Sequence, residues 1–79
     1  MKKNTNNLRK KAEELFDREK YDDVINLLTA EVLETQKDAE LYVWRGFTWY
    51  NKKDYDKAIA DYNKALEINP NYELVTTQV

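Results

Sequence analysis

Side chains that carry out chemistry in most enzymes are missing from this chain. Its 79 residues include no cysteine, no histidine and no serine. The chain therefore lacks thiolate and serine nucleophiles, disulfides, the usual zinc ligands and the commonest general base. We expect a protein that is not an enzyme, with no catalytic residue and no cofactor.

Acidic side chains remain as candidates for a metal site. Asp54, Asp56 and Asp61 resemble part of a calcium-binding loop in composition, but their spacing differs from that loop and its glycine is missing. Asp38 and Asp54 each precede a helical pattern, where an aspartate commonly caps the helix. The other acids lie near lysine and arginine on solvated helix faces. We therefore expect no metal site.

The charge balance argues against two classes of partner. Lysine and arginine number 13 and aspartate and glutamate number 15, so the net charge is -2. Such a balance gives no strong field for nucleic acid or an anionic membrane. The basic residues 1–11 are not followed by an apolar run of signal-peptide length, and the sequence shows no spanning segment. We expect a cytoplasmic protein that binds neither nucleic acid nor membranes.

Apolar residues recur at helical intervals along most of the chain, which contains one glycine and one proline. This pattern predicts an all-α fold with four helices. The first ends near residues 18–20, the second runs from about Asp22 past Val32, the third starts after Asp38, and the fourth runs between Asp54 and Pro70. Two joins are very short, so the helices should form two antiparallel hairpins. The apolar stripe of the fourth helix consists of Tyr55, Ala58, Ile59, Tyr62, Ala65 and Leu66.

The sequence also repeats itself. A shift of 34 residues superposes Tyr21 on Tyr55 and Ile25 on Ile59. The second unit, residues 39–72, resembles a tetratricopeptide repeat, whose pattern is W-x2-L-G-x2-Y, then A-x3-F, a small residue and P. The residues that match are Tyr42, Gly46, Trp49, Ala58, Tyr62, Ala65 and Pro70. Arg45 departs from the pattern, because the family favours leucine there.

The first unit, residues 5–38, resembles a degenerate copy of the same repeat. Its counterparts of the pattern residues are Leu8, Ala12, Leu15, Val24 and Leu28, with Ala12 in place of glycine and Gln36 in place of proline. The resemblance implies two hairpins stacked as a short right-handed α-solenoid. Residues 1–4 are then a basic tail, and residues 73–79 are a short tail or a partial capping helix.

The third helix presents three different faces. Tyr42, Gly46 and Trp49 share the face that the repeat pattern assigns to the core, where Gly46 should face Ala58 at the closest approach of two helices. A second face carries Val43, Phe47 and Tyr50, with Glu40, Trp44 and Asn51 along its edge. The polar side consists of Arg45, Thr48 and Lys52.

The family resemblance gives the second face a role. In tetratricopeptide repeats the first helix of each hairpin lines a concave groove that holds a partner peptide. The residues expected in that groove are Arg9, Lys10, Glu13, Phe16, Val43, Trp44, Phe47, Tyr50 and Asn51. Capture of an acidic chaperone tail does not fit, because Val43, Trp44 and Phe47 occupy positions that would need polar side chains.

Two interpretations of the aromatic residues stay open at this stage. They can line a groove for a partner peptide, or they can be consumed by internal packing or self-association. Arrays of this kind usually need about three repeats. Two units predict that the chain either belongs to a longer array or forms a homodimer that buries the uncovered last helix.

Overall fold

A computed structural model describes the backbone of residues 5–71 and the side chains of residues 7–71. These residues form five helices and no strand: α1 (Thr5–Asp17), α2 (Tyr21–Leu27), α3 (Ala30–Gln36), α4 (Ala39–Asn51) and α5 (Tyr55–Ile68). The predicted all-α fold is confirmed, as a small helical solenoid of the kind expected. The predicted tails, residues 1–4 and 73–79, lie outside the described residues.

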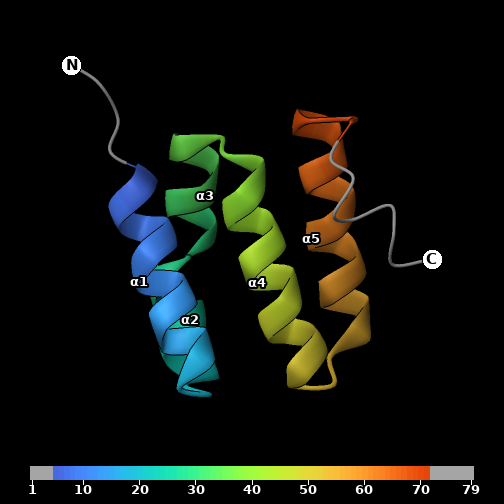
Figure 1. The fold of residues 1–79 in the computed structure, drawn as a ribbon. Coiled ribbons are helices and arrows are strands. Elements are labelled where there is room, and N and C mark those ends of the chain that lie inside the picture. The colour runs from blue at the N-terminus through green and yellow to red at the C-terminus, as the bar shows by residue number, and fades with distance from the viewer. Residues whose placement is uncertain (1–4, 72–79) are drawn as a thin grey trace.

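The long helix α4 is the centre of the molecule. It lies between α1 on one side and α5 on the other, while α2 lies behind α1 and α3 is seen between α1 and α4 (Figure 1). The helices α1 and α2 pack against each other, as do α4 and α5. Buried apolar side chains from all five helices and from the α2–α3 join form one core around α4: Ala12, Val24, Leu28, Leu33, Ala39, Leu41, Tyr42, Val43 and Ala65.

Both helical hairpins turn with the same backbone geometry. Glu19, after α1, and Lys53, after α4, have φ angles of 61° and 68°. After α1, the N–H of Lys20 donates to the carbonyl of Leu15, and after α4 the N–H of Asp54 donates to the carbonyl of Trp49, both at 2.9 Å. This is the Schellman arrangement that ends many helices. The two turns occupy equivalent positions in the 34-residue alignment.

The left-handed conformation of Lys53 costs free energy, because it places the Cβ close to the following carbonyl oxygen. We expect Lys53→Gly to raise the free energy of unfolding by about 0.5–1 kcal/mol, after allowance for the greater unfolded-state entropy of glycine. Urea denaturation followed by circular dichroism measures the change. Lys11→Gly, at an exposed position inside α1, is the control and should lower the same quantity by about 1 kcal/mol. If Lys53→Gly lowered the free energy of unfolding as much as Lys11→Gly does, the left-handed turn at Lys53 would be contradicted.

The prediction of one second helix from Asp22 past Val32 is wrong. The helix is interrupted at Leu28 and Thr29, which separates α2, beginning at Tyr21, from α3. Thr29 has extended backbone, and its hydroxyl accepts a hydrogen bond from the N–H of Val32. A threonine that bonds to the backbone in this way starts a helix in preference to continuing one.

Other predicted helix ends are confirmed. The Asp38 carboxylate accepts from the N–H of Glu40 at 3.0 Å, and the Asp54 carboxylate accepts from the N–H of Lys57 at 3.4 Å. The last helix ends at Ile68, two residues before Pro70. Local sequence therefore determined where α4 and α5 begin and where α5 ends.

Gly46 packs closely against α5, and the atoms nearest to a Cβ at this position belong to Tyr62. A Cβ built on Gly46 would lie 2.5 Å from Cε1 of the Tyr62 ring. Ala58 is itself buried at 1% exposure. The glycine of the repeat pattern thus makes room for the aromatic ring of the same pattern, in agreement with a close helix–helix contact.

Arg45, the residue that departs from the repeat pattern, forms a partly buried ion pair with Asp61. Its Nε and Nη2 donate to the two carboxylate oxygens of Asp61 at 2.8 and 2.7 Å. Its Nη1 donates to the carbonyl of Leu28 at 3.3 Å, where α2 ends. Asp61 is 4% exposed and Thr48, on the same side of α4, is fully buried. Two residues of the predicted polar side, Arg45 and Thr48, are therefore covered by the fold, while the third, Lys52, is exposed.

Candidate partner-binding surface

A continuous row of aromatic rings crosses one side of the molecule from α2 to α5. The Phe16 ring lies 5.5 Å from the rings of Tyr21 and Trp44, measured between centroids. Trp44 and Phe47 are 5.8 Å apart and nearly perpendicular. Phe47 in turn lies 5.9 Å from Tyr62. Edge-to-face contacts at these distances are favourable, so the row is a packed and orderly surface.

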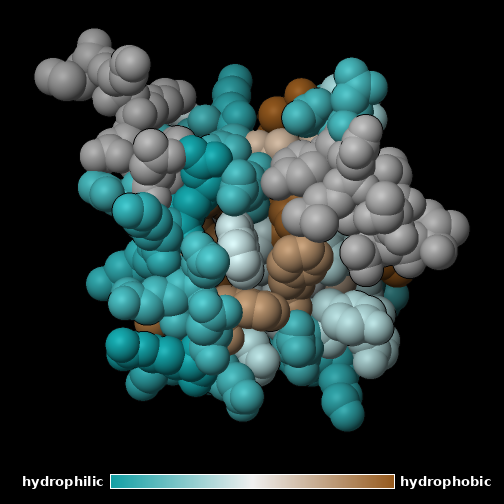
Figure 2. Space-filling model, viewed as in Figure 1, coloured by the Kyte–Doolittle hydropathy of each residue, from teal (hydrophilic) through white to brown (hydrophobic). Residues whose placement is uncertain are grey.

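Phe16, Trp44 and Phe47, together with Arg9 and Glu40, are called the α1–α4 face below. The three rings pack on the edge of the core and stay partly exposed. Figure 2 shows apolar and near-neutral side chains gathered in the middle of this side, with hydrophilic side chains over α1 next to them. The α1–α4 face thus has an apolar centre and a polar border.

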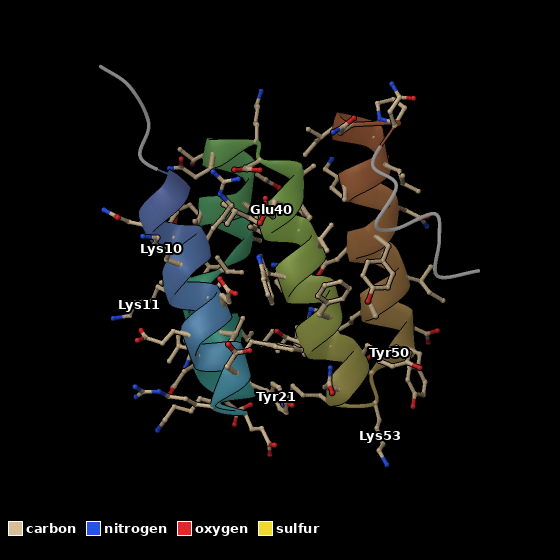
Figure 3. The ribbon with its side chains drawn as sticks, viewed as in Figure 1. Lys10, Lys11, Tyr21, Glu40, Tyr50 and Lys53 are labelled. Carbon is tan, nitrogen blue, oxygen red and sulfur yellow. The ribbon has the colours of Figure 1, made fainter. Side chains whose placement is uncertain are left out.

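Ion pairs border the apolar centre at both ends. The Arg9 guanidinium donates to the Glu40 carboxylate at 2.9 Å and lies 3.9 Å from Asp38. Glu40 projects from α4 toward α1 in Figure 3. At the other end, the Lys52 ammonium lies 2.6 Å from the carboxylate of Asp22. Pairs this exposed contribute little stability, and they leave charged groups available at the border.

Several residues predicted for the groove lie on or beside this face. Phe16, Trp44 and Phe47 come together, while Tyr50 at 57% exposure lies at the far end of α4, next to α5 (Figure 3). Glu13 is exposed, and so is Asn51, whose amide donates to the carbonyl of Phe47 at 2.8 Å. Three residues that the sequence predicted for the groove, Phe16, Trp44 and Phe47, are therefore in mutual contact in the structure.

Two predicted groove residues lie elsewhere. Val43 is 1% exposed and belongs to the core, because α4 has neighbours on more than one side and its second face is partly covered. Lys10 lies on the side of α1 that faces away from α4, together with Lys11 (Figure 3). Neither side chain is part of the α1–α4 face.

The second hairpin has a close contact at Gly46 and a left-handed turn at Lys53, and its sequence also matches a known family. Residues 39–72 match the family model described as the tetratricopeptide repeat. These residues form a tetratricopeptide repeat. The family consists of non-enzymatic interaction repeats that generally mediate protein–protein contacts. Searches of curated proteins and of solved structures gave no match to the chain.

The tetratricopeptide repeat carries a further surface that the sequence did not single out. A pocket of about 410 Å³ opens between α4 and α5 and is lined by Phe47, Tyr50, Tyr55, Ala58, Ile59 and Tyr62. These six residues are called the α4–α5 groove. Tyr55 and Ile59 are 50% and 55% exposed, although their place on the apolar stripe of α5 had suggested packing. The apolar stripe is wider than the area that α4 covers.

Burial affects the tyrosines of the repeat. Desolvation raises the pKa of Tyr62 above the ordinary value of 10.0, with a smaller contribution from Tyr50, and desolvation also raises the pKa of Tyr42. Both phenols are therefore protonated at neutral pH, where a hydroxyl can donate as well as accept a hydrogen bond.

Trp49 is partly buried, and the Lys57 ammonium lies 4.5 Å from the centre of its ring.

Across residues 5–71, no group of three or more acidic, histidine or cysteine side chains is placed to hold a metal ion. Over the same stretch, the helices are too short or too polar to cross a membrane.

Proposed function

We propose that the chain binds a protein partner, as an extended or helical peptide segment, through the α1–α4 face. The observation that carries the proposal is the cluster of Phe16, Trp44 and Phe47, which stays partly exposed at the centre of that face while the core beneath it is filled. Rigid aromatic side chains with a polar border are typical of the centre of protein interfaces. The interaction role of tetratricopeptide repeats supports the same conclusion.

The α1–α4 face contains residues of both hairpins. We therefore also propose that the first unit, residues 5–38, is a divergent copy of the repeat. The matching turns at Glu19 and Lys53 support this interpretation. The family match itself covers residues 39–72. The break between α2 and α3 is the main departure of the first unit from a regular hairpin.

The chemistry of the face suggests what the partner offers. Trp44 and Phe47 supply an apolar centre for large hydrophobic side chains. Arg9 and Glu40 already neutralise each other, so a charged partner group at that end must compete with an existing ion pair. We therefore expect binding to depend more on apolar anchors than on charge, and to weaken only slightly with salt.

Trp44→Ala tests the proposal. Peptides are first selected from a random dodecapeptide display library against the unaltered chain. We expect their affinity for Trp44→Ala to fall at least about tenfold, because truncation of a central aromatic anchor typically costs about 2 kcal/mol or more. Fluorescence anisotropy measures binding, and circular dichroism checks that the helices persist. The matched control is Ile68→Ala, which removes an apolar side chain of α5 that is also partly exposed at 38%. Selected peptides that bind Trp44→Ala normally would contradict the proposal.

Self-association is the alternative function. Tyr50, Tyr55 and Ile59, all at least half exposed, favour it because they leave an apolar area of α4 and α5 uncovered. An assembly module would bury this area against another copy of the chain. Light scattering over a hundredfold concentration range distinguishes the two functions, since a dimer of this kind would dissociate in the Tyr50→Ala variant.

A further inference from the structure

The α4–α5 groove has a composition unlike that of the rest of the surface. Its lining of Phe47, Tyr50, Tyr55, Ala58, Ile59 and Tyr62 contains four aromatic rings and no charged side chain. Charged residues make up 35% of the whole chain, so an uncharged depression of this size is an exception. It lies outside most of the α1–α4 face and shares only Phe47 with it.

The rings of the groove form two edge-to-face pairs. Tyr50 and Tyr55 are 5.2 Å apart at the turn between α4 and α5, and Phe47 and Tyr62 are 5.9 Å apart farther along the helices. Tyr55 and Tyr62 are two helical turns apart, about 10 Å along the axis of α5. Along α5 the groove therefore presents two aromatic positions with Ile59 between them, while their partners Tyr50 and Phe47 are about one helical turn apart on α4.

The polar groups of the groove restrict what can fill it. Three of its rings are tyrosines, whose hydroxyls can donate hydrogen bonds to a ligand that has free acceptors. A helical ligand uses its own carbonyls internally, and strand addition needs an open sheet edge, which residues 5–71 do not provide. A polyproline II segment has solvated carbonyls, no internal hydrogen bonds and a rise of about 3.1 Å per residue, so one turn covers about 9 Å.

We propose that the α4–α5 groove binds a proline-rich segment of a partner protein in the polyproline II conformation. Two prolines one turn apart pack on the Tyr50–Tyr55 and Phe47–Tyr62 pairs, and tyrosine hydroxyls donate to the carbonyls between them. The recognition of proline-rich segments by aromatic-lined grooves rests on the same complementarity. The uncharged lining fits an uncharged segment, and it favours such a segment over an acidic or basic peptide.

The test uses the full chain and three uncharged decapeptides: decaproline, a helix-forming leucine–glutamine peptide and a flexible glycine–asparagine peptide. We expect only decaproline to bind saturably in a nuclear magnetic resonance titration, with the largest shifts around Tyr55 and Ile59. Ile59→Ala and Tyr55→Phe should each weaken binding at least about threefold, and Tyr50→Ala at least about tenfold. Ile68→Ala, on the same helix outside the groove, should bind as the unaltered chain does.

Several results would overturn the proposal. These are the absence of saturable decaproline binding, equal binding of the helical peptide, or unchanged affinity in Tyr50→Ala. A dimer that dissociates on Tyr50→Ala would show that a second copy fills the groove. Nuclear Overhauser contacts from the Tyr55 ring to residues 72–79 would show that the chain fills it with its own segment. Binding at the α1–α4 face is followed separately, through the indole signal of Trp44 with the display-selected peptides. The absence of binding at one surface is therefore distinguishable from the absence of binding at the other.

Discussion

Replacing Arg45 with leucine, the residue that the tetratricopeptide pattern favours there, is expected to lower the free energy of unfolding by about 3–5 kcal/mol. The substitution leaves the Asp61 carboxylate without its partner at a position that is 4% exposed. It also removes the hydrogen bond from Arg45 to the carbonyl of Leu28. A domain of this length is stable by about 4–12 kcal/mol, so the loss is a large part of the total.

A second substitution should restore most of that stability. Arg45→Leu/Asp61→Leu replaces the ion pair with two apolar side chains, and such replacements are often neutral or stabilising. Leu27 occupies the position equivalent to Asp61 in the first unit, so leucine is compatible with this site in the fold. We expect the double variant to lie within about 1 kcal/mol of the unaltered chain in urea denaturation. An Arg45→Leu variant as stable as the unaltered chain would show that the ion pair is not required.

Gly46→Val is expected to lower the free energy of unfolding by about 2–3 kcal/mol. The new Cβ would lie 2.5 and 2.7 Å from two atoms of the Tyr62 ring, a separation that real Cβ atoms essentially never show. Overpacking of this kind typically costs about 1–3 kcal/mol. Valine is also a weaker helix former than alanine, so most of the helical gain from replacing glycine is lost.

The clash can be separated from other effects by a double-mutant cycle. Gly46→Ala is measured in the unaltered chain and in a Tyr62→Leu background, where a smaller side chain faces the glycine. The alanine should cost stability in the first case and cost less, or add stability, in the second. Thermal unfolding followed by circular dichroism gives both values. Equal effects of the alanine in the two backgrounds would rule out the Tyr62 ring as the cause.

These two contacts explain how one repeat is held together. Gly46 and Tyr62 set the close approach of α4 and α5, and the Arg45–Asp61 pair fixes their relative rotation and connects them to the end of α2. The α1–α4 face and the α4–α5 groove both depend on α4 being held in this orientation. A loss of either contact should therefore weaken binding at both surfaces, through the fold and without direct contact to a partner.

Local sequence was sufficient for a large part of the architecture. Periodic apolar residues, the caps at Asp38 and Asp54 and the stop before Pro70 predicted α4 and α5, because helix ends depend on residues close in sequence. The same information predicted the repeat in residues 39–72. It also placed Phe16, Trp44 and Phe47 on faces that the fold brings together.

Tertiary structure decided which of those faces are covered. Periodicity gives the angle of a side chain around its own helix and says nothing about how many neighbours that helix has. The central helix α4 has neighbours on several sides, which buried Val43 and Thr48, while α5 has fewer and left Tyr55 and Ile59 exposed. The Arg45–Asp61 pair and the hydrogen bond from Arg45 to the carbonyl of Leu28 are likewise long-range outcomes, because they join segments that only the folded chain places in contact.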